Sequence, residues 1–200
     1  MLSVLRTFAL FCGVAAFGYA SSDDPKTLTI VMDFDGPHSS GSVSAMKQEL
    51  EGILQGSGLT LDWRIPSEAA HKDFDNLAVV RFRGNCILRP VGYLYDERGP
   101  LAYTHTSDGA MLPFSEVDCN TVTGLMRQAM YGRDYKQADL LLGRALGRVL
   151  AHELVHILTQ SGQHSRDGIA QETLSARQLI SETLPLSAED IVRLREKSRR

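Results

Sequence analysis

Apolar and polar residues follow one another along the chain in two rhythms, one typical of strands and one of helices. Short runs rich in β-branched residues, or apolar at every second position, predict strands over residues 27–32, 59–65, 76–82, 101–106 and 112–117. The stretch Ser107-Asp108-Gly109 favours a tight turn, because Asp and Gly supply a local hydrogen bond and a positive φ. The last two strands are therefore expected to form a hairpin or a sheet edge.

Apolar residues three or four positions apart predict helices between and after these strands. The predicted helices cover residues 43–54, a segment that begins at Thr121, residues 138 to about 159, residues 174–180 with Ser175 as a cap, and a terminal segment from Ser187. No internal repeat or low-complexity tract divides the chain. We expect one α+β domain over residues 21–200, with a small mixed sheet packed on helices that include one buried helix.

The first twenty residues differ from the rest of the chain. Arg6 is the only charged side chain before Asp23, and residues 7–20 are apolar and end in Gly18-Tyr19-Ala20. At 1.5 Å per residue this stretch is too short for a bilayer core of about 30 Å, and its end suits a signal peptidase. Residues 1–20 are therefore interpreted as a signal peptide that is cleaved after Ala20, which predicts a secreted or periplasmic protein without stable membrane insertion.

Composition excludes one class of partner. The chain is 43% hydrophobic and 22% charged, with a formal net charge of -3. Its basic residues are not interleaved with aromatic ones as on a nucleic-acid surface, so no nucleic-acid partner is expected. The oligomeric state stays open.

Two cysteines remain after the predicted cleavage, Cys86 and Cys119. Secreted chains enter an oxidising compartment in which a pair of thiols usually forms a bridge. A disulfide between Cys86 and Cys119 is therefore predicted.

The long helical segment carries a concentrated set of polar groups, His152-Glu153-Leu154-Val155-His156. Two histidines four positions apart project from the same face of a helix, close enough to bind one metal ion, and Zn²⁺ is the ion expected for such a pair. Glu153 lies beside them and is expected to act as general base and then general acid. Apolar residues surround the three, and a buried helix seldom carries such polar groups without a partner.

A catalytic zinc ion usually takes three protein ligands and keeps a fourth position for water. His164 is the nearest candidate for the third ligand, eight residues after His156, and Gly162 is expected to end the helix and turn the chain back. Glu172 and Glu182 are rival ligands from the segment that follows.

The chain resembles the zincin metallopeptidases through its His-Glu-x-x-His motif, and the further histidine is similar to the metzincin branch. It departs from that branch in the spacing to His164, which is eight residues instead of six, and in the absence of a later Met for a Met-turn. Residues 101–119 (LAYTHTSDGAMLPFSEVDC) and 151–170 (AHELVHILTQSGQHSRDGIA) are similar to small secreted bacterial zincin-like proteins. This resemblance implies a zincin-like fold and zinc-dependent hydrolysis of peptide or protein substrates.

The resemblance also implies an edge strand that binds extended peptide beside the active-site helix, either residues 101–106 or residues 112–117. Tyr103 and His105 are candidates for stabilising the oxyanion. Ser115 lacks the glycines of a nucleophile elbow and is assigned no chemistry. A second hypothesis is a secreted, non-catalytic binding or scaffold protein stabilised by a structural zinc ion, which would need no base at Glu153.

Overall fold

The structure, a computed structural model, describes residues 26–91, 99–130 and 135–198. The segment interpreted as a signal peptide therefore lies outside the described residues. The five strands are β1 (Lys26–Phe34), β2 (Leu59–Arg64), β3 (Leu77–Arg83), β4 (Ala102–Ser107) and β5 (Ala110–Asp118). The helical segments are α1 (Ser40–Leu54), α2 (Pro66–Ala69), α3 (Cys119–Ala129), the 3₁₀ turn η1 (Tyr135–Gln137), α4 (Ala138–Thr159), α5 (Ala176–Ile180) and α6 (Ala188–Ser198).

The strands form one mixed sheet in the order β2-β1-β3-β5-β4. β2, β1, β3 and β5 run parallel to their neighbours, whereas β4 pairs antiparallel with β5. Asp108 and Gly109, both with positive φ, turn the chain between β4 and β5, as the sequence predicted. Among the described residues, β4 pairs only with β5 and so forms one edge of the sheet. Of the two predicted edge strands, residues 101–106 therefore correspond to the edge strand.

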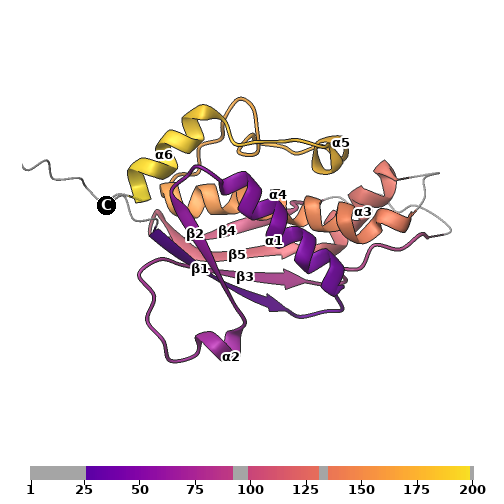
Figure 1. Cartoon of the computed structure of the whole chain (residues 1–200), viewed down its shortest axis with the longest axis horizontal. Helices are drawn as coiled ribbons and strands as arrows, with labels where there is room; N and C mark the ends of the chain where they lie inside the picture. The colour runs from indigo at the N-terminus through magenta and orange to yellow at the C-terminus, as the bar shows by residue number, and fades with distance from the viewer. Residues whose placement is uncertain (1–25, 92–98, 131–134, 199–200) are drawn as a thin grey trace, which may run out of the picture.

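The long helices cover one face of this sheet (Figure 1). Strand residues of alternating positions face α1 and α4, because side chains in a strand point to opposite faces in turn. The core that results contains Leu28, Ile30 and Met32 of β1, Ala78, Val80 and Phe82 of β3, Met46, Leu50 and Leu54 of α1, and Leu142, Leu146, Leu150 and Leu154 of α4. α4 is consequently a buried helix, and the predicted α+β architecture is confirmed.

α1 and α4 approach each other closely through small residues. A Cβ atom on Gly143 would lie 2.4 Å from Ala45 Cβ and 2.5 Å from the carbonyl oxygen of Ser42. A side chain at Gly143 is therefore incompatible with this spacing of the helices. Close packing against α1 fixes the position of the helix that carries the polar motif.

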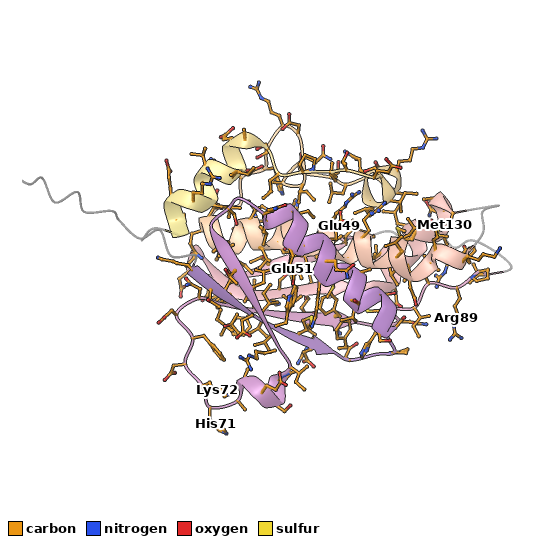
Figure 2. All side chains as sticks on the ribbon, in the orientation of Figure 1. Glu49, Glu51, His71, Lys72, Arg89 and Met130 are labelled. Carbon is orange, nitrogen blue, oxygen red and sulfur yellow. A yellow bond between two sulfur atoms is a disulfide. The ribbon has the colours of Figure 1, made fainter. Side chains whose placement is uncertain are left out.

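The C-terminal segment with α5 and α6 lies over the helices, away from the sheet (Figure 1). Arg148, fully buried on α4, binds Glu49 of α1 at 2.7 Å and donates to the carbonyl of Gln178 and to the hydroxyl of Ser181. Glu49 projects from α1, whereas His71 lies in the loop after α2, remote from the helical layer (Figure 2). A buried guanidinium therefore joins α1, α4 and α5, with its charge paired and its donors used.

Cys86 and Cys119 form a disulfide with their Cα atoms 4.9 Å apart, as predicted from the sequence. The bridge connects the segment after β3 to the first residue of α3. It closes a loop of 33 residues, for which the chain-entropy picture gives about 3–4 kcal/mol of stabilisation.

Two local expectations need correction. The first helix begins at Ser40 and not at residue 43, because Ser39 caps it by accepting hydrogen bonds from the backbone N–H groups of Gly41 and Ser42. The short helix α2 has no apolar period and was not predicted. Within the described residues, no helix combines the length and the apolar character that crossing a bilayer requires.

Candidate metal and catalytic site

The polar motif sits in the last two turns of α4. His152 is half-buried, while Glu153 and His156 are buried. The two turns before the motif, residues 145–151, are buried, so this part of the helix is packed on all sides. The ring centroids of the two histidines lie 4.8 Å apart, as expected for i, i+4 positions on one helical face.

The hydrogen bonds of the two histidines define which ring nitrogens carry protons. Nδ1 of His152 lies 3.0 Å from the carbonyl oxygen of Ile169, and Nδ1 of His156 lies 2.7 Å from that of Ser161. Because a carbonyl only accepts, each Nδ1 must donate, and each neutral ring keeps its lone pair on Nε2. The two Nε2 atoms face each other at 3.0 Å.

This arrangement fits a metal ion. Two lone pairs aimed at each other across 3.0 Å repel unless a cation or a shared proton lies between them. Burial lowers the pKa of His152 to about 4, against the hydrogen bond to Ile169, so a shared proton is disfavoured near neutral pH. Carbonyl partners on the Nδ1 atoms are also the outer contacts that metal-binding histidines usually make.

His164 completes the cluster from the loop after α4. Its ring centroid lies 5.2 Å from that of His152 and 4.9 Å from that of His156. One ligand atom of each of the three residues lies within 4.8 Å of the others. His164 is exposed, and the loss of some of its water contacts lowers its pKa, which favours the neutral ring that binds a metal. The structure therefore gathers the three histidines that the sequence proposed as ligands.

The turn that brings His164 back is made by Gln160 and not by Gly162. Gln160 is the C-cap of α4 with φ 52° and ψ 42°, in the left-handed region where a glycine is usual. Its side-chain amide donates to the carbonyls of Ile157, at 2.8 Å, and Met111, at 3.1 Å. These two bonds, one of them to β5, stabilise a conformation that is uncommon for a residue with a side chain.

Glu153 points toward the sheet and is held there by β4. One of its carboxylate oxygens accepts a hydrogen bond of 2.7 Å from the hydroxyl of Thr104. Burial raises the pKa of the Glu153 carboxyl, whereas the Thr104 hydroxyl, His156 and the nearby Ser115 hydroxyl act against that rise. The sequence interpretation missed Thr104 and assigned Ser115 no role, although both polar side chains lie at positions that the strand alternation places on one face.

Tyr103 and His105 direct their side chains away from Glu153, contrary to the expectation that one of them stabilises an oxyanion, although Tyr103 also borders the depression around the three histidines. They flank Thr104 in β4, so their side chains point to the other face of the sheet. There His105 Nε2 lies 3.4 Å from Glu116, and a hydrogen bond to Glu116 raises the pKa of the Tyr103 hydroxyl. Arg83 also binds Glu116, at 3.1 Å, which makes this a separate ion-paired group.

The two rival carboxylate ligands differ in position. Glu172 lines the depression that contains His152, His156 and His164, and it is exposed. It is not one of the three grouped ligand side chains. Glu182 accepts a hydrogen bond on its backbone carbonyl from Arg148, one turn before His152 on α4, and its side chain is not among the grouped ligands. Histidine is therefore the better supported third ligand.

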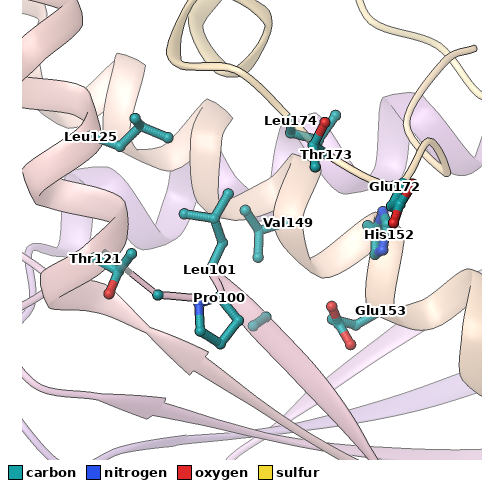
Figure 3. Close-up of a pocket in the computed structure, with 12 residues that line it drawn as sticks. Pro100, Leu101, Thr121, Leu125, Val149, His152, Glu153, Glu172, Thr173 and Leu174 are labelled. Atoms are coloured by element: carbon teal, nitrogen blue, oxygen red, sulfur yellow. The ribbon is translucent and has the colours of Figure 1, made fainter. Parts of the chain in front are cut away.

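A cavity of about 300 Å³ adjoins the histidine cluster (Figure 3). His152, Glu153 and Glu172 lie at one end, and Leu125 and Thr121 lie at the other (Figure 3). Between them the lining is mainly apolar, with Pro100, Leu101, Val149 and Leu174. The cavity can receive an apolar side chain next to the polar groups.

Comparison with known proteins supports the fold. No protein-family model and no curated protein matches the chain. Among solved structures, the archaemetzincin of Methanopyrus kandleri aligns over 90% of this chain and 99% of that chain, with a TM-score of 0.53 and 13% sequence identity. The fold is zincin-like. Identity this low establishes the shared fold, and the chemistry has to be argued from the site itself.

Proposed function

We propose that this chain is a secreted zinc-dependent metalloendopeptidase in which His152, His156 and His164 hold Zn²⁺ and Glu153 transfers protons. One observation carries the proposal: two imidazoles whose Nδ1 atoms donate to carbonyls present their Nε2 lone pairs to each other at 3.0 Å. A neutral pair of this kind, with a third histidine beside it, is suited to a divalent cation. The zincin-like fold supports the same reading.

The number of grouped ligands favours catalysis over a structural role. Structural zinc sites close all four positions with protein ligands, whereas catalytic sites keep one open. Within the described residues three side chains group as ligands, and the depression around them opens to solvent. A structural site needs no proton acceptor beside its ligands, whereas Glu153 is a buried carboxylate next to both His152 and the grouped His156. These features weigh against the non-catalytic zinc-stabilised scaffold.

Glu153 is placed and tuned to move a proton. A bound zinc ion would supply Lewis acidity, which lowers the pKa of water and polarises a carbonyl. Glu153 takes the proton of the attacking water on a carboxylate oxygen and delivers it to the nitrogen of the leaving amine. Burial raises the pKa of the Glu153 carboxyl above its ordinary value, which makes it a stronger base for the proton it accepts. Thr104 fixes the orientation of the carboxylate.

β4 supplies a surface for an extended peptide. It pairs with β5 on one side, and its other side is the edge of the sheet. A peptide that adds to this edge forms backbone hydrogen bonds independent of its sequence and passes Thr104, whose hydroxyl contacts Glu153. Such binding needs no free peptide terminus, which favours cleavage within a chain.

The cavity beside His152 adds selectivity to this binding. We propose that it receives an apolar side chain of the substrate, because Leu101, Val149 and Leu125 line it. Its volume of about 300 Å³ exceeds that of one large side chain. Peptides with Leu, Met or Phe next to the cleaved bond are therefore the expected substrates.

Secretion is proposed from the interpretation of residues 1–20 as a signal peptide. The disulfide between Cys86 and Cys119 is compatible with an oxidising compartment. The small secreted bacterial zincin-like proteins that the sequence resembles are the proposed relatives.

Turnover by wild type and by Glu153→Gln tests the catalytic role. Both zinc-loaded proteins are incubated with a mixed peptide library, and the products are identified by mass spectrometry. We expect cleavage at internal bonds by wild type, and a loss of at least about 100-fold for Glu153→Gln with its zinc retained. Equal cleavage by the two proteins would exclude Glu153 as the base, and no cleavage by zinc-loaded wild type would contradict the peptidase.

A further inference from the structure

The loop that carries His164 depends on the last helix for its position. It runs from the end of α4 at Thr159 to the start of α5 at Ala176. Its backbone folds back on itself where Ser165 N–H donates to the Ala170 carbonyl at 2.8 Å, and Ile169 N–H donates to the Pro185 carbonyl at 3.1 Å. The loop thus rests on the segment that leads into α6.

Asp190 is the centre of a buried polar group at the start of α6. Its carboxylate is fully buried, and one oxygen accepts a 2.7 Å hydrogen bond from Ser165 while the other accepts one of 2.7 Å from Ser187. Arg193 pairs with the same carboxylate and donates to the Ser165 hydroxyl at 2.9 Å. Ser165 is the residue directly after His164, so this group holds the backbone one peptide bond from the proposed ligand.

The contacts between Asp190 and Ser187 are explained by the capping of α6 alone. Ser187 accepts from the Asp190 N–H at 3.1 Å while the Asp190 carboxylate accepts from Ser187, a reciprocal cap of α6. The bonds to Ser165 are extra to that cap and reach out of the helix to the loop. Burial would raise the pKa of Asp190, but the hydrogen bonds from Ser187, Ser165 and Arg193 outweigh it and lower that pKa, so the charged form is retained.

The same loop also holds His152. Ile169 accepts from His152 Nδ1 on its carbonyl and donates its own N–H to the Pro185 carbonyl, one residue before the Ala170 carbonyl that Ser165 binds. Gly168, with φ 73°, allows the loop to approach this segment, since a Cβ there would lie 2.7 Å from the Pro185 carbonyl oxygen. Displacement of Ser165 would therefore move His164 and loosen the partner of His152.

We infer that Asp190, through Ser165, is a positioning residue for the metal site: the first turn of α6 holds the His164 loop in its ligand-binding conformation. The inference rests on the proposed zinc site. This inference gives α6 a role in the metal site that could not be predicted from the sequence, since Asp190 and Ser165 are 25 positions apart in the chain.

Zinc affinity, measured by competition with a chromophoric chelator, tests this role without reference to activity. Ser165→Ala and Asp190→Asn are compared with Ser165→Thr, which keeps the hydroxyl, and with Asp139→Asn. Asp139 is a matched control because its carboxylate also accepts from two serines, Ser39 and Ser42, but at the far end of α4. We expect zinc affinity to fall about 10- to 100-fold for the first two variants and to stay within about twofold of wild type for the controls.

A second measurement separates positioning from general destabilisation. In a His164→Ala background the loop no longer presents a ligand, so Ser165→Ala should weaken zinc binding much less than it does in the wild-type chain, with any remaining loss passing through the Ile169 contact of His152. Thermal unfolding of the metal-free protein still records any loss of stability. Equal losses of zinc affinity in the wild-type and His164→Ala backgrounds would overturn the inference, as would unchanged affinity in Ser165→Ala. Failure of wild type to bind zinc would instead overturn the proposed metal site, and with it this role.

Discussion

Thr104 of the edge strand donates a hydrogen bond of 2.7 Å to Glu153 of the buried helix. This bond connects the surface proposed to bind the substrate to the group proposed to move its proton. It also lowers a carboxyl pKa that burial raises. In the proposed function, this side chain would couple peptide binding to proton transfer.

Replacement of Thr104 by Val should lower kcat/KM by about tenfold, because a hydrogen bond to a buried charged group is lost. It should also change the pH profile. Without the hydroxyl the pKa of Glu153 rises further, so the decline of kcat/KM toward acid pH begins at a higher pH. Thr104→Ser should restore both properties, and Thr106→Val, at an exposed position of the same strand, is the control. A profile unchanged by Thr104→Val would contradict the role of this bond.

Leu125→Trp should narrow the cavity beside His152 and change selectivity. Leu125 lines the end of the cavity away from His152 and Glu153 (Figure 3). We expect kcat/KM to fall about 10- to 100-fold for peptides with Phe next to the cleaved bond, and to change little for peptides with Ala there. Leu140→Trp, on an exposed part of α4, controls for the added ring. Equal losses for both peptides would exclude the cavity as a side-chain site.

Two glycine substitutions in α1 and α4 should change the free energy of unfolding in opposite directions. Gly143→Ala places a Cβ 2.5 Å from the Ser42 carbonyl oxygen, and should lower the free energy of unfolding by about 1–3 kcal/mol or more. Gly52→Ala, also within a helix, meets no atom within 4 Å and should raise it by about 0.5–1 kcal/mol. Urea denaturation compares the two. A neutral Gly143→Ala would show that the helices are more loosely packed.

The metal-free protein should lose stability as the pH falls below 6.5. Burial lowers the pKa of His152 from 6.5 to about 4 in the folded state, so the unfolded chain takes up the proton first. The free energy of unfolding then declines between pH 6.5 and about pH 4, by up to about 3 kcal/mol from this residue. Denaturation of wild type and His152→Gln at several pH values measures the difference, and equal slopes would contradict the burial of His152.

The elements of this fold follow closely from local sequence patterns. α4 has the bounds 138–159 that its apolar spacing predicted, and Ser175 caps α5 as expected. These features depend on residues close together in the chain, where spacing and capping act directly. The pairing of His152 and His156 was also predictable from local sequence, since residues at i and i+4 lie side by side in any helix.

Local sequence patterns could not predict the contacts between segments that lie far apart in the chain. Thr104 and Glu153 are 49 positions apart, and their contact depends on the sheet order that puts β4 beside α4. The alternation along β4 indicated only that Thr104 faces the side opposite to Tyr103 and His105. Likewise, nothing near His164 in sequence indicates that Asp190 supports its loop. Tertiary packing decides both.

Calorimetric titration of the metal-free protein with zinc tests the three-histidine site most directly. Wild type should bind one zinc ion per chain, with an affinity that drops about 100-fold or more in His152→Ala, His156→Ala and His164→Ala, while His38→Ala, which stacks on Phe34 just before α1 and is not one of the three grouped ligands, binds as wild type does. Absence of binding by wild type, or unchanged binding by the three variants, would contradict a zinc site formed by His152, His156 and His164.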